Sequence, residues 1–197
     1  MKDALARLGI SAFVAHADIK PTKEWQDEIE NALASMEGFV ALLTGGFHDS
    51  DWTDQEVGFA VARGVPIIAV RLGKDPYGFI GKFQGLSCDW AHAALEIAKL
   101  LINQPKVLDS FLCSISGISS FEQANFSAEL FPSIERLSDA QVEQLIESFN
   151  GNSQVRESYG FNGKNPSHYG RGLPYYLSRL TGRKYELNAR DRLHLVL

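Results

Sequence analysis

The most informative part of the sequence is Thr44-Gly45-Gly46-Phe47-His48-Asp49-Ser50-Asp51-Trp52-Thr53-Asp54-Gln55-Glu56. It follows an apolar run at 39–43 that predicts a buried strand, and it leads into a helical repeat. The two glycines end the strand, and the short polar residues after them provide turn and helix-capping side chains. Trp52 and Glu56 are four residues apart, so a helix places them on one face. A carboxylate beside an indole at the carboxyl end of a strand is a candidate catalytic pair.

Apolar runs and helical repeats alternate on both sides of this stretch. The runs predict strands at 11–16, 39–44 and 65–72, and the repeats predict helices at 2–8, 22–37, 52–63 and 89–102. Strands that alternate with helices at this spacing form a parallel sheet covered on both faces. Such sheets bind ligands at the carboxyl ends of their strands. The loops expected at that edge are 17–23, 45–51 and 73–85.

The pattern changes after residue 105. Helices are expected at 121–130, 138–150 and 173–180, and a weak alternation at 192–197 is compatible with a terminal strand. The segment 107–115 fits either a helix or a strand. We therefore expect two domains, an α/β domain at 1–103 and a smaller, mostly helical domain at 104–197.

Composition indicates a globular protein and limits its partners. The chain has 197 residues, of which 45% are hydrophobic, and no apolar run reaches the length of a membrane span, so we expect a cytoplasmic protein with free thiols at Cys88 and Cys113. The net charge of −5 argues against a general nucleic-acid binder. From Arg156 to the end, however, eight Lys or Arg stand against three Asp or Glu. That asymmetry fits docking between the two halves or between copies, and it leaves a surface for a nucleotide or nucleic acid open.

Simpler interpretations exist for several of these residues. Trp52 and Glu56 also fit the first turns of an ordinary helix, with the indole half-buried and the carboxylate at its rim. Acidic side chains around a helix start are explained by capping and by the helix dipole, so no metal site is expected. The tyrosines near the carboxyl end fit either stacking on bases or packing within the protein.

The first 103 residues resemble a Toll/interleukin-1 receptor (TIR) domain of the bacterial kind. The resemblance rests on the segment 11–16 with the proline-bearing loop after it, on Trp25–Leu33, on Phe39–Thr44, and above all on Ser50–Glu56 before the next buried strand. It implies a flavodoxin-like parallel sheet. In that family the fold begins with a central strand that precedes the first helix, and we expect residues 2–8 to correspond to that helix. Either the sequence is shortened at its amino end, or another segment fills the position of the strand. The segment 192–197 is the terminal candidate for filling that position.

The resemblance also implies an activity. Bacterial TIR domains commonly cleave the nicotinamide–ribose bond of NAD⁺, giving ADP-ribose or a cyclised relative, often in anti-phage defence or signalling. The family's catalytic glutamate corresponds to Glu56, and NAD⁺ is then a substrate, with no further cofactor expected. The expected substrate-binding residues are Trp52, Phe47, His48, Asp51, His16, Asp18 and Lys20, the last two in the loop that resembles the family's mobile BB loop.

Two other functions fit the same sequence. One is a TIR scaffold that recruits partners without catalysis, and the other is an enzyme related to nucleoside hydrolases or deoxyribosyltransferases, which also set a glutamate against a ribose. Self-association through the TIR domain and the carboxyl-terminal domain is expected for the NAD-cleaving enzyme and for the scaffold.

Overall fold

The computed structural model describes residues 1–14, 18, 25–49 and 52–196. The chain forms two compact units, one made of residues 1–2 and 11–101 and the other of residues 3–10 and 102–197. Helix α1 (Lys2–Arg7) belongs almost entirely to the second unit, although it lies at the amino end of the chain. The serine at position 110 binds the carbonyl of Gly9 at 2.6 Å, which fixes this segment to the second unit.

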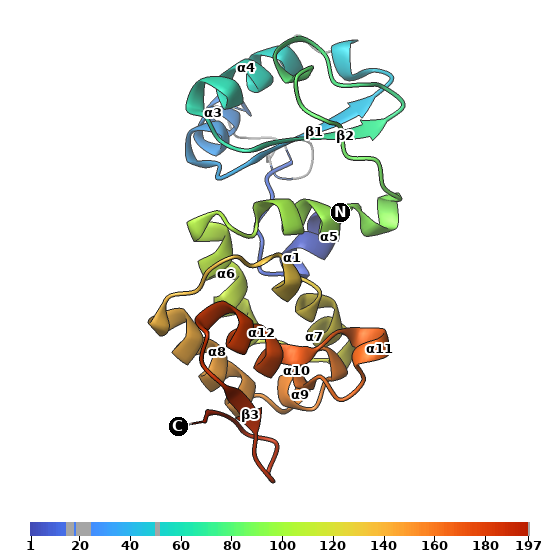
Figure 1. Ribbon diagram of the computed structural model, residues 1–197. Helices are drawn as coiled ribbons and strands as arrows, with labels where there is room; N and C mark the ends of the chain where they lie inside the picture. Colours follow the sequence, from blue (N-terminus) through green and yellow to red (C-terminus); the bar gives the residue numbers. More distant parts are fainter. Residues whose placement is uncertain (15–17, 19–24, 50–51, 197) are drawn as a thin grey trace. The chain divides into compact units, whose positions relative to one another are not determined.

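The first unit contains a two-stranded parallel sheet. Strand β1 (Phe39–Thr44) pairs with β2 (Ile67–Leu72) in the register Phe39↔Ile67 to Thr44↔Leu72, which confirms the strands predicted at these positions. The helices are α3 (Trp25–Ser35), α4 (Thr53–Arg63) and α5 (Trp90–Leu101), and short 3₁₀ turns η1 (Phe47–Asp49) and η2 (Gly78–Ile80) lie in the loops. In Figure 1, α3 and α4 lie on one side of the strands and α5 on the other.

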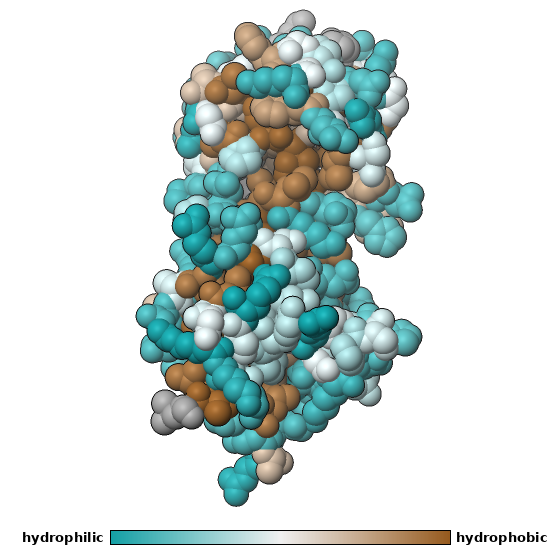
Figure 2. Space-filling model, viewed as in Figure 1, coloured by the Kyte–Doolittle hydropathy of each residue, from teal (hydrophilic) through white to brown (hydrophobic). Residues whose placement is uncertain are grey.

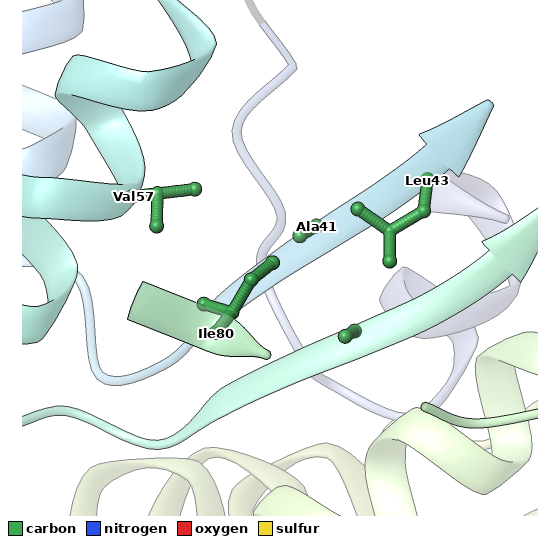
Figure 3. Packing of buried hydrophobic residues seen from close by; sticks show 5 residues of the cluster. Ala41, Leu43, Val57 and Ile80 are labelled. Carbon is green, nitrogen blue, oxygen red and sulfur yellow. The ribbon is translucent and has the colours of Figure 1, made fainter. Parts of the chain in front are cut away.

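The core of the first unit lies between β1, β2 and α4. Ala41, Leu43 and Ala69 from the strands meet Val57 from α4 and Ile80 from η2, as Figure 3 shows. All five are at most 5% exposed, because alternate strand residues and the inner helix face point to the same space. This packing fixes the direction in which α4 leaves the strand edge.

The other edge of β1 differs from the expected fold. Phe39 donates to the carbonyl of Pro66 and the carbonyl of Leu43 accepts from Lys74, so the odd-numbered residues of β1 bond toward β2. Val40 and Leu42 therefore direct their backbone groups away from β2. Within the residues described, no strand pairs with that edge.

One strand prediction is wrong over its described residues, and a second strand forms but not in the position considered for it. Residues 11–14 form no strand, and the remaining two positions of that predicted strand lie outside the described residues. The terminal alternation does form a strand, β4 (Leu193–Leu195), but it pairs antiparallel with β3 (Tyr185–Leu187) inside the second unit. It therefore does not fill the central position of the first sheet.

The second unit is mostly helical. Its remaining elements are α6 (Pro105–Ile115), α7 (Phe121–Ala128), η3 (Phe131–Ser133), α8 (Asp139–Gly151), α9 (Ser153–Arg156), α10 (Tyr159–Asn162), α11 (Pro166–Tyr169) and α12 (Gly172–Thr181). Phe131 is fully buried at the centre and packs against Phe111, Phe161 and Tyr176, with ring centroids 5.1–6.0 Å apart. The face of this unit seen in Figure 2 is covered mainly by hydrophilic and intermediate residues. Among the described helices, none combines the length and apolar character needed to cross a bilayer.

Candidate active site

The start of α4 is fixed by the loop that leaves β1. The hydroxyl of Thr53 donates to the carbonyl of Phe47 at 2.7 Å, and the backbone N–H of Glu56 donates to the carbonyl of Trp52 at 2.9 Å. Trp52 is therefore the N-cap residue, and the helix begins one residue later than predicted. The first turn carries Glu56 on the same face as Trp52, as their spacing requires.

Trp52 and Glu56 line one groove between α3 and α4. Its volume is about 450 Å³, and its walls also include Asn31 from α3 and Phe59 from α4. The remaining lining residues are Ile29, Glu30, Leu33, Ala34 and Gln55. Arg63 donates to the carbonyls of Leu33 and Met36 at 2.7 and 3.2 Å, which ties the carboxyl end of α4 to that of α3. The two walls of the groove are thus held together at one end.

Trp52, which lines the groove, packs against a second tryptophan. The rings of Trp25 and Trp52 lie with centroids 4.7 Å apart at an interplanar angle of 80°, an edge-to-face contact. Trp25 remains 46% exposed and Phe59 is 42% exposed. Trp25 thus packs on Trp52 and also leaves an aromatic surface open to solvent.

Glu56 is a half-buried carboxylate. Burial raises the pKa of Glu56 above that of an exposed glutamate, because partial removal of water disfavours the charged form. Glu30 contributes a second carboxylate to the lining, with one oxygen accepting from Gln26 at 3.0 Å. The described lining contains these two acids and no cationic side chain, so the groove favours a positively charged ligand group.

A second hollow lies on the opposite side of α4. It has a volume of about 530 Å³ and is lined by Asp54, Val57 and residues 77–80. Tyr77 donates to Asp54 at 2.6 Å, and burial followed by the nearby carboxylate raises the pKa of Tyr77 to about 12. Phe47 packs edge-to-face on Tyr77 with centroids 6.2 Å apart and contacts the core cluster. The structure thus places Phe47 with Tyr77, while Trp52 and Glu56 share the other groove.

The other predicted site residues are placed only in part. Asp18 accepts from the side chain of Lys2 and from the backbone N–H of Val14, and the hydrogen bond from Lys2 is the main reason why the pKa of Asp18 is lowered. His48 lies in η1, and the structure does not describe its side chain. His16, Lys20 and Asp51 lie outside the described residues. In the described part of the chain, no group of three or more His, Cys, Asp or Glu side chains is arranged to hold a metal.

Comparison with known proteins settles the family. A family model described as TIR domain matches residues 1–101, just over half of the chain. The chain belongs to the TIR domain family. No curated protein and no solved structure matches the chain. The match includes both walls of the groove, so the candidate site lies wholly within the TIR domain.

Three residues that line the groove of this TIR domain, two on α3 and one on α4, had no role predicted from the sequence. Glu30, Asn31 and Phe59 all line the groove, and none was predicted as a site residue. Phe59 was within reach of the sequence argument, because it follows Glu56 by three residues and so shares its helix face. The two α3 residues gave no such signal, since their contribution depends on how α3 packs against α4.

Proposed function

We propose that this TIR protein cleaves the bond between nicotinamide and ribose in NAD⁺, with Glu56 as the catalytic carboxylate. The observation that supports the proposal most is the shared groove of Glu56 and Trp52 between α3 and α4. Members of the TIR family act in signalling or in NAD cleavage, and this groove has the residue types that the second activity needs.

The chemistry requires an anion more than an acid. Nicotinamide bound to ribose is a cationic pyridinium and leaves as a neutral molecule, so the leaving group needs no proton. As the bond breaks, positive charge develops on the ribose, and a carboxylate beside it stabilises that charge. Glu56 is half-buried, so its charge is screened less than that of an exposed glutamate.

The groove suits the nicotinamide–ribose end of the substrate. Glu30 and Glu56 attract the pyridinium ring, and Trp52 offers a face on which a cation can lie. The amide of Asn31 has the donors and acceptor needed for a carboxamide or a ribose hydroxyl. As the bond from C1′ to the nicotinamide nitrogen breaks and neutral nicotinamide leaves, water or a hydroxyl of the same nucleotide bonds to C1′ and loses its proton to solvent, giving ADP-ribose or a cyclic product. The same proposal includes a role of this reaction in anti-phage defence. It also includes self-association of the protein through both units.

A second candidate is a TIR scaffold without catalysis. The exposed aromatic rings of Trp25 and Phe59, at 46% and 42%, favour it, because aromatic side chains are enriched where proteins bind partners. In that case partner binding would depend on Trp25 and Phe59, and Glu56 would be dispensable.

Product analysis separates these functions from each other and from a nucleoside-cleaving enzyme. The purified full chain is incubated with NAD⁺, with inosine and with deoxyadenosine, and the products are separated by liquid chromatography. We expect nicotinamide from NAD⁺ and no free base from either nucleoside. Release of bases from the nucleosides alone would instead assign the nucleoside-cleaving reaction, and no product from any of the three at protein concentrations that permit assembly would favour the scaffold.

A further inference from the structure

A group of aromatic and basic side chains lies on the surface of the second unit. It consists of Tyr159 on α10, Tyr169 on α11, Arg171 just after α11 and Tyr175 on α12, and we refer to these four residues as the Tyr–Arg surface. The three tyrosines are 48%, 42% and 39% exposed. Large rings with so much open area are available to a ligand, unlike Tyr176 next to them, which is buried.

The rings are held in defined orientations. Tyr159 and Tyr169 are stacked, with centroids 5.5 Å apart and an angle of 30° between their planes. The guanidinium of Arg171 lies over the ring of Tyr175, with its central carbon 4.6 Å from the ring centroid. Tyr175 in turn packs edge-to-face on the buried Tyr176 at 5.3 Å. The surface therefore presents flat aromatic faces next to a guanidinium whose position is already set.

The loop that carries Tyr169 and Arg171 is closed at its base by two glycines. Gly163 and Gly172 have φ of 71° and 76°. A Cβ added to Gly163 would lie 2.4 Å from the carbonyl oxygen of Arg171, and one added to Gly172 would lie 2.4 Å from the backbone nitrogen of Gly163. Lys164 adds a contact to both carboxylate oxygens of Asp191 at 2.9 and 2.8 Å. A loop fixed in this way loses little conformational entropy when it binds a ligand.

The charges nearby point to a small phosphate-bearing ligand. Six of the eight Lys and Arg from residue 156 onward bind acidic side chains or carbonyls of the chain itself: Arg156, Lys164, Arg179, Arg183, Lys184 and Arg192. Within the described residues, the guanidinium of Arg171 has no hydrogen bond or ion pair, so its donors can take a phosphate. A nucleic acid would need a row of such cations along its backbone, which this surface does not offer.

We propose that the Tyr–Arg surface binds a single nucleotide, with the base stacked on an exposed tyrosine face and a phosphate bound by Arg171. Every base has a flat π-face that stacks on tyrosine, and the adjacent guanidinium binds phosphate with two parallel hydrogen bonds. The site is separate from the groove in the TIR domain and does not depend on the reaction proposed for it.

Binding of AMP to the full chain tests this proposal. Titration followed by NMR gives the dissociation constant for AMP, for ribose 5-phosphate and for a single-stranded oligonucleotide of ten thymidines. We expect AMP to bind at least about fivefold more tightly than ribose 5-phosphate, because only AMP carries a base that can stack. Tyr169→Leu and Arg171→Ala are each expected to weaken AMP binding at least about fivefold.

Control variants distinguish loss of binding at the Tyr–Arg surface from misfolding and from binding in the groove between α3 and α4. Tyr169→Phe retains the ring and Arg190→Ala removes a cation from the same basic segment, so both should keep the dissociation constant within about twofold. Trp52→Ala should also leave AMP binding unchanged. The proposal is overturned if AMP does not bind, if Arg190→Ala weakens binding as much as Arg171→Ala, or if Trp52→Ala removes it. If the oligonucleotide binds far more tightly than AMP, the ligand of this surface is a nucleic acid and the single-nucleotide proposal is overturned.

Discussion

Replacing Glu56 by glutamine should remove most of the activity and leave the fold intact. Gln has the shape of Glu without its charge, so the variant removes only the electrostatic contribution to the transition state. A unit charge about 4 Å from a cation contributes about 4 kcal/mol at an effective dielectric constant of 20 and about 1 kcal/mol in bulk water. Glu56 is half-buried and lies between these limits. Since 1.36 kcal/mol is a factor of ten, we expect a rate about 5- to 1000-fold lower.

The stability of the same variant should move in the other direction. Because the pKa of Glu56 is raised on folding, its charged form is disfavoured in the folded state. The stability that neutral Glu56 provides is present below its unfolded-state pKa and is lost as the pH rises through its folded-state pKa. Glu56→Gln escapes this loss, so its thermal midpoint at pH 7 should equal or exceed that of the wild type.

The assay is initial-rate release of nicotinamide from NAD⁺, run beside a thermal melt of each protein. Asp54→Asn is the matched control, because Asp54 is in the same helical turn and faces the hollow on the other side of α4. It should stay within about threefold of the wild type, since water and salt screen a charge that faces away from the substrate. Equal rates for Glu56→Gln and wild type would refute the electrostatic role, as would an equal loss in both variants.

Three further predictions follow from the groove and the core beneath it. The rate of NAD⁺ cleavage should fall toward acid pH with a midpoint above that of an exposed glutamate, because protonation removes the charge of Glu56; a profile flat down to about pH 4 would contradict this. Trp52→Ala should raise KM, and it should lower the free energy of unfolding by about 0.5–1.5 kcal/mol through loss of the ring contact with Trp25. Trp52→Phe should keep most of the substrate affinity and most of the stability. Unchanged kinetics in the alanine variant would exclude Trp52 from the site. Leu43→Ala should lower the free energy of unfolding by about 3–5 kcal/mol, because Leu43 is fully buried. The control Leu100→Ala should lower it by less than about 1 kcal/mol, because Leu100 is 57% exposed. Similar losses for both variants in chemical denaturation would disprove the core assignment.

Local features of the fold were readable from the sequence. The apolar run predicted β1 at Phe39–Thr44, and the glycine at position 64 predicted where α4 ends. Both predictions succeed because strand burial and a left-handed helix end depend on the residues themselves. The meeting of Trp52 and Glu56 follows from helix geometry alone, so tertiary packing could not change it. The groove around them was not predictable in the same way.

The features that sequence reasoning missed depend on packing between distant segments. Residues 11–14 have a strand-like composition but form no strand, since β propensity alone does not provide a paired neighbouring strand. The alternation at 192–197 pairs with β3 because the short connection between them costs little loop entropy. The placement of Phe47 against Tyr77 is set by the η1 turn and by the core below it. The direction of such a side chain cannot be deduced from its position in the chain.

The groove between α3 and α4 is proposed to hold the nicotinamide–ribose end of NAD⁺. Saturation-transfer NMR on the Glu56→Gln chain tests this, because the variant turns the substrate over more slowly than the wild type does. The Arg171→Ala change is added to weaken binding at the Tyr–Arg surface. The account predicts the strongest saturation on the nicotinamide protons and its loss when Trp52→Ala is added. Strongest saturation on the adenine protons, or a nicotinamide signal that persists without Trp52, would contradict it.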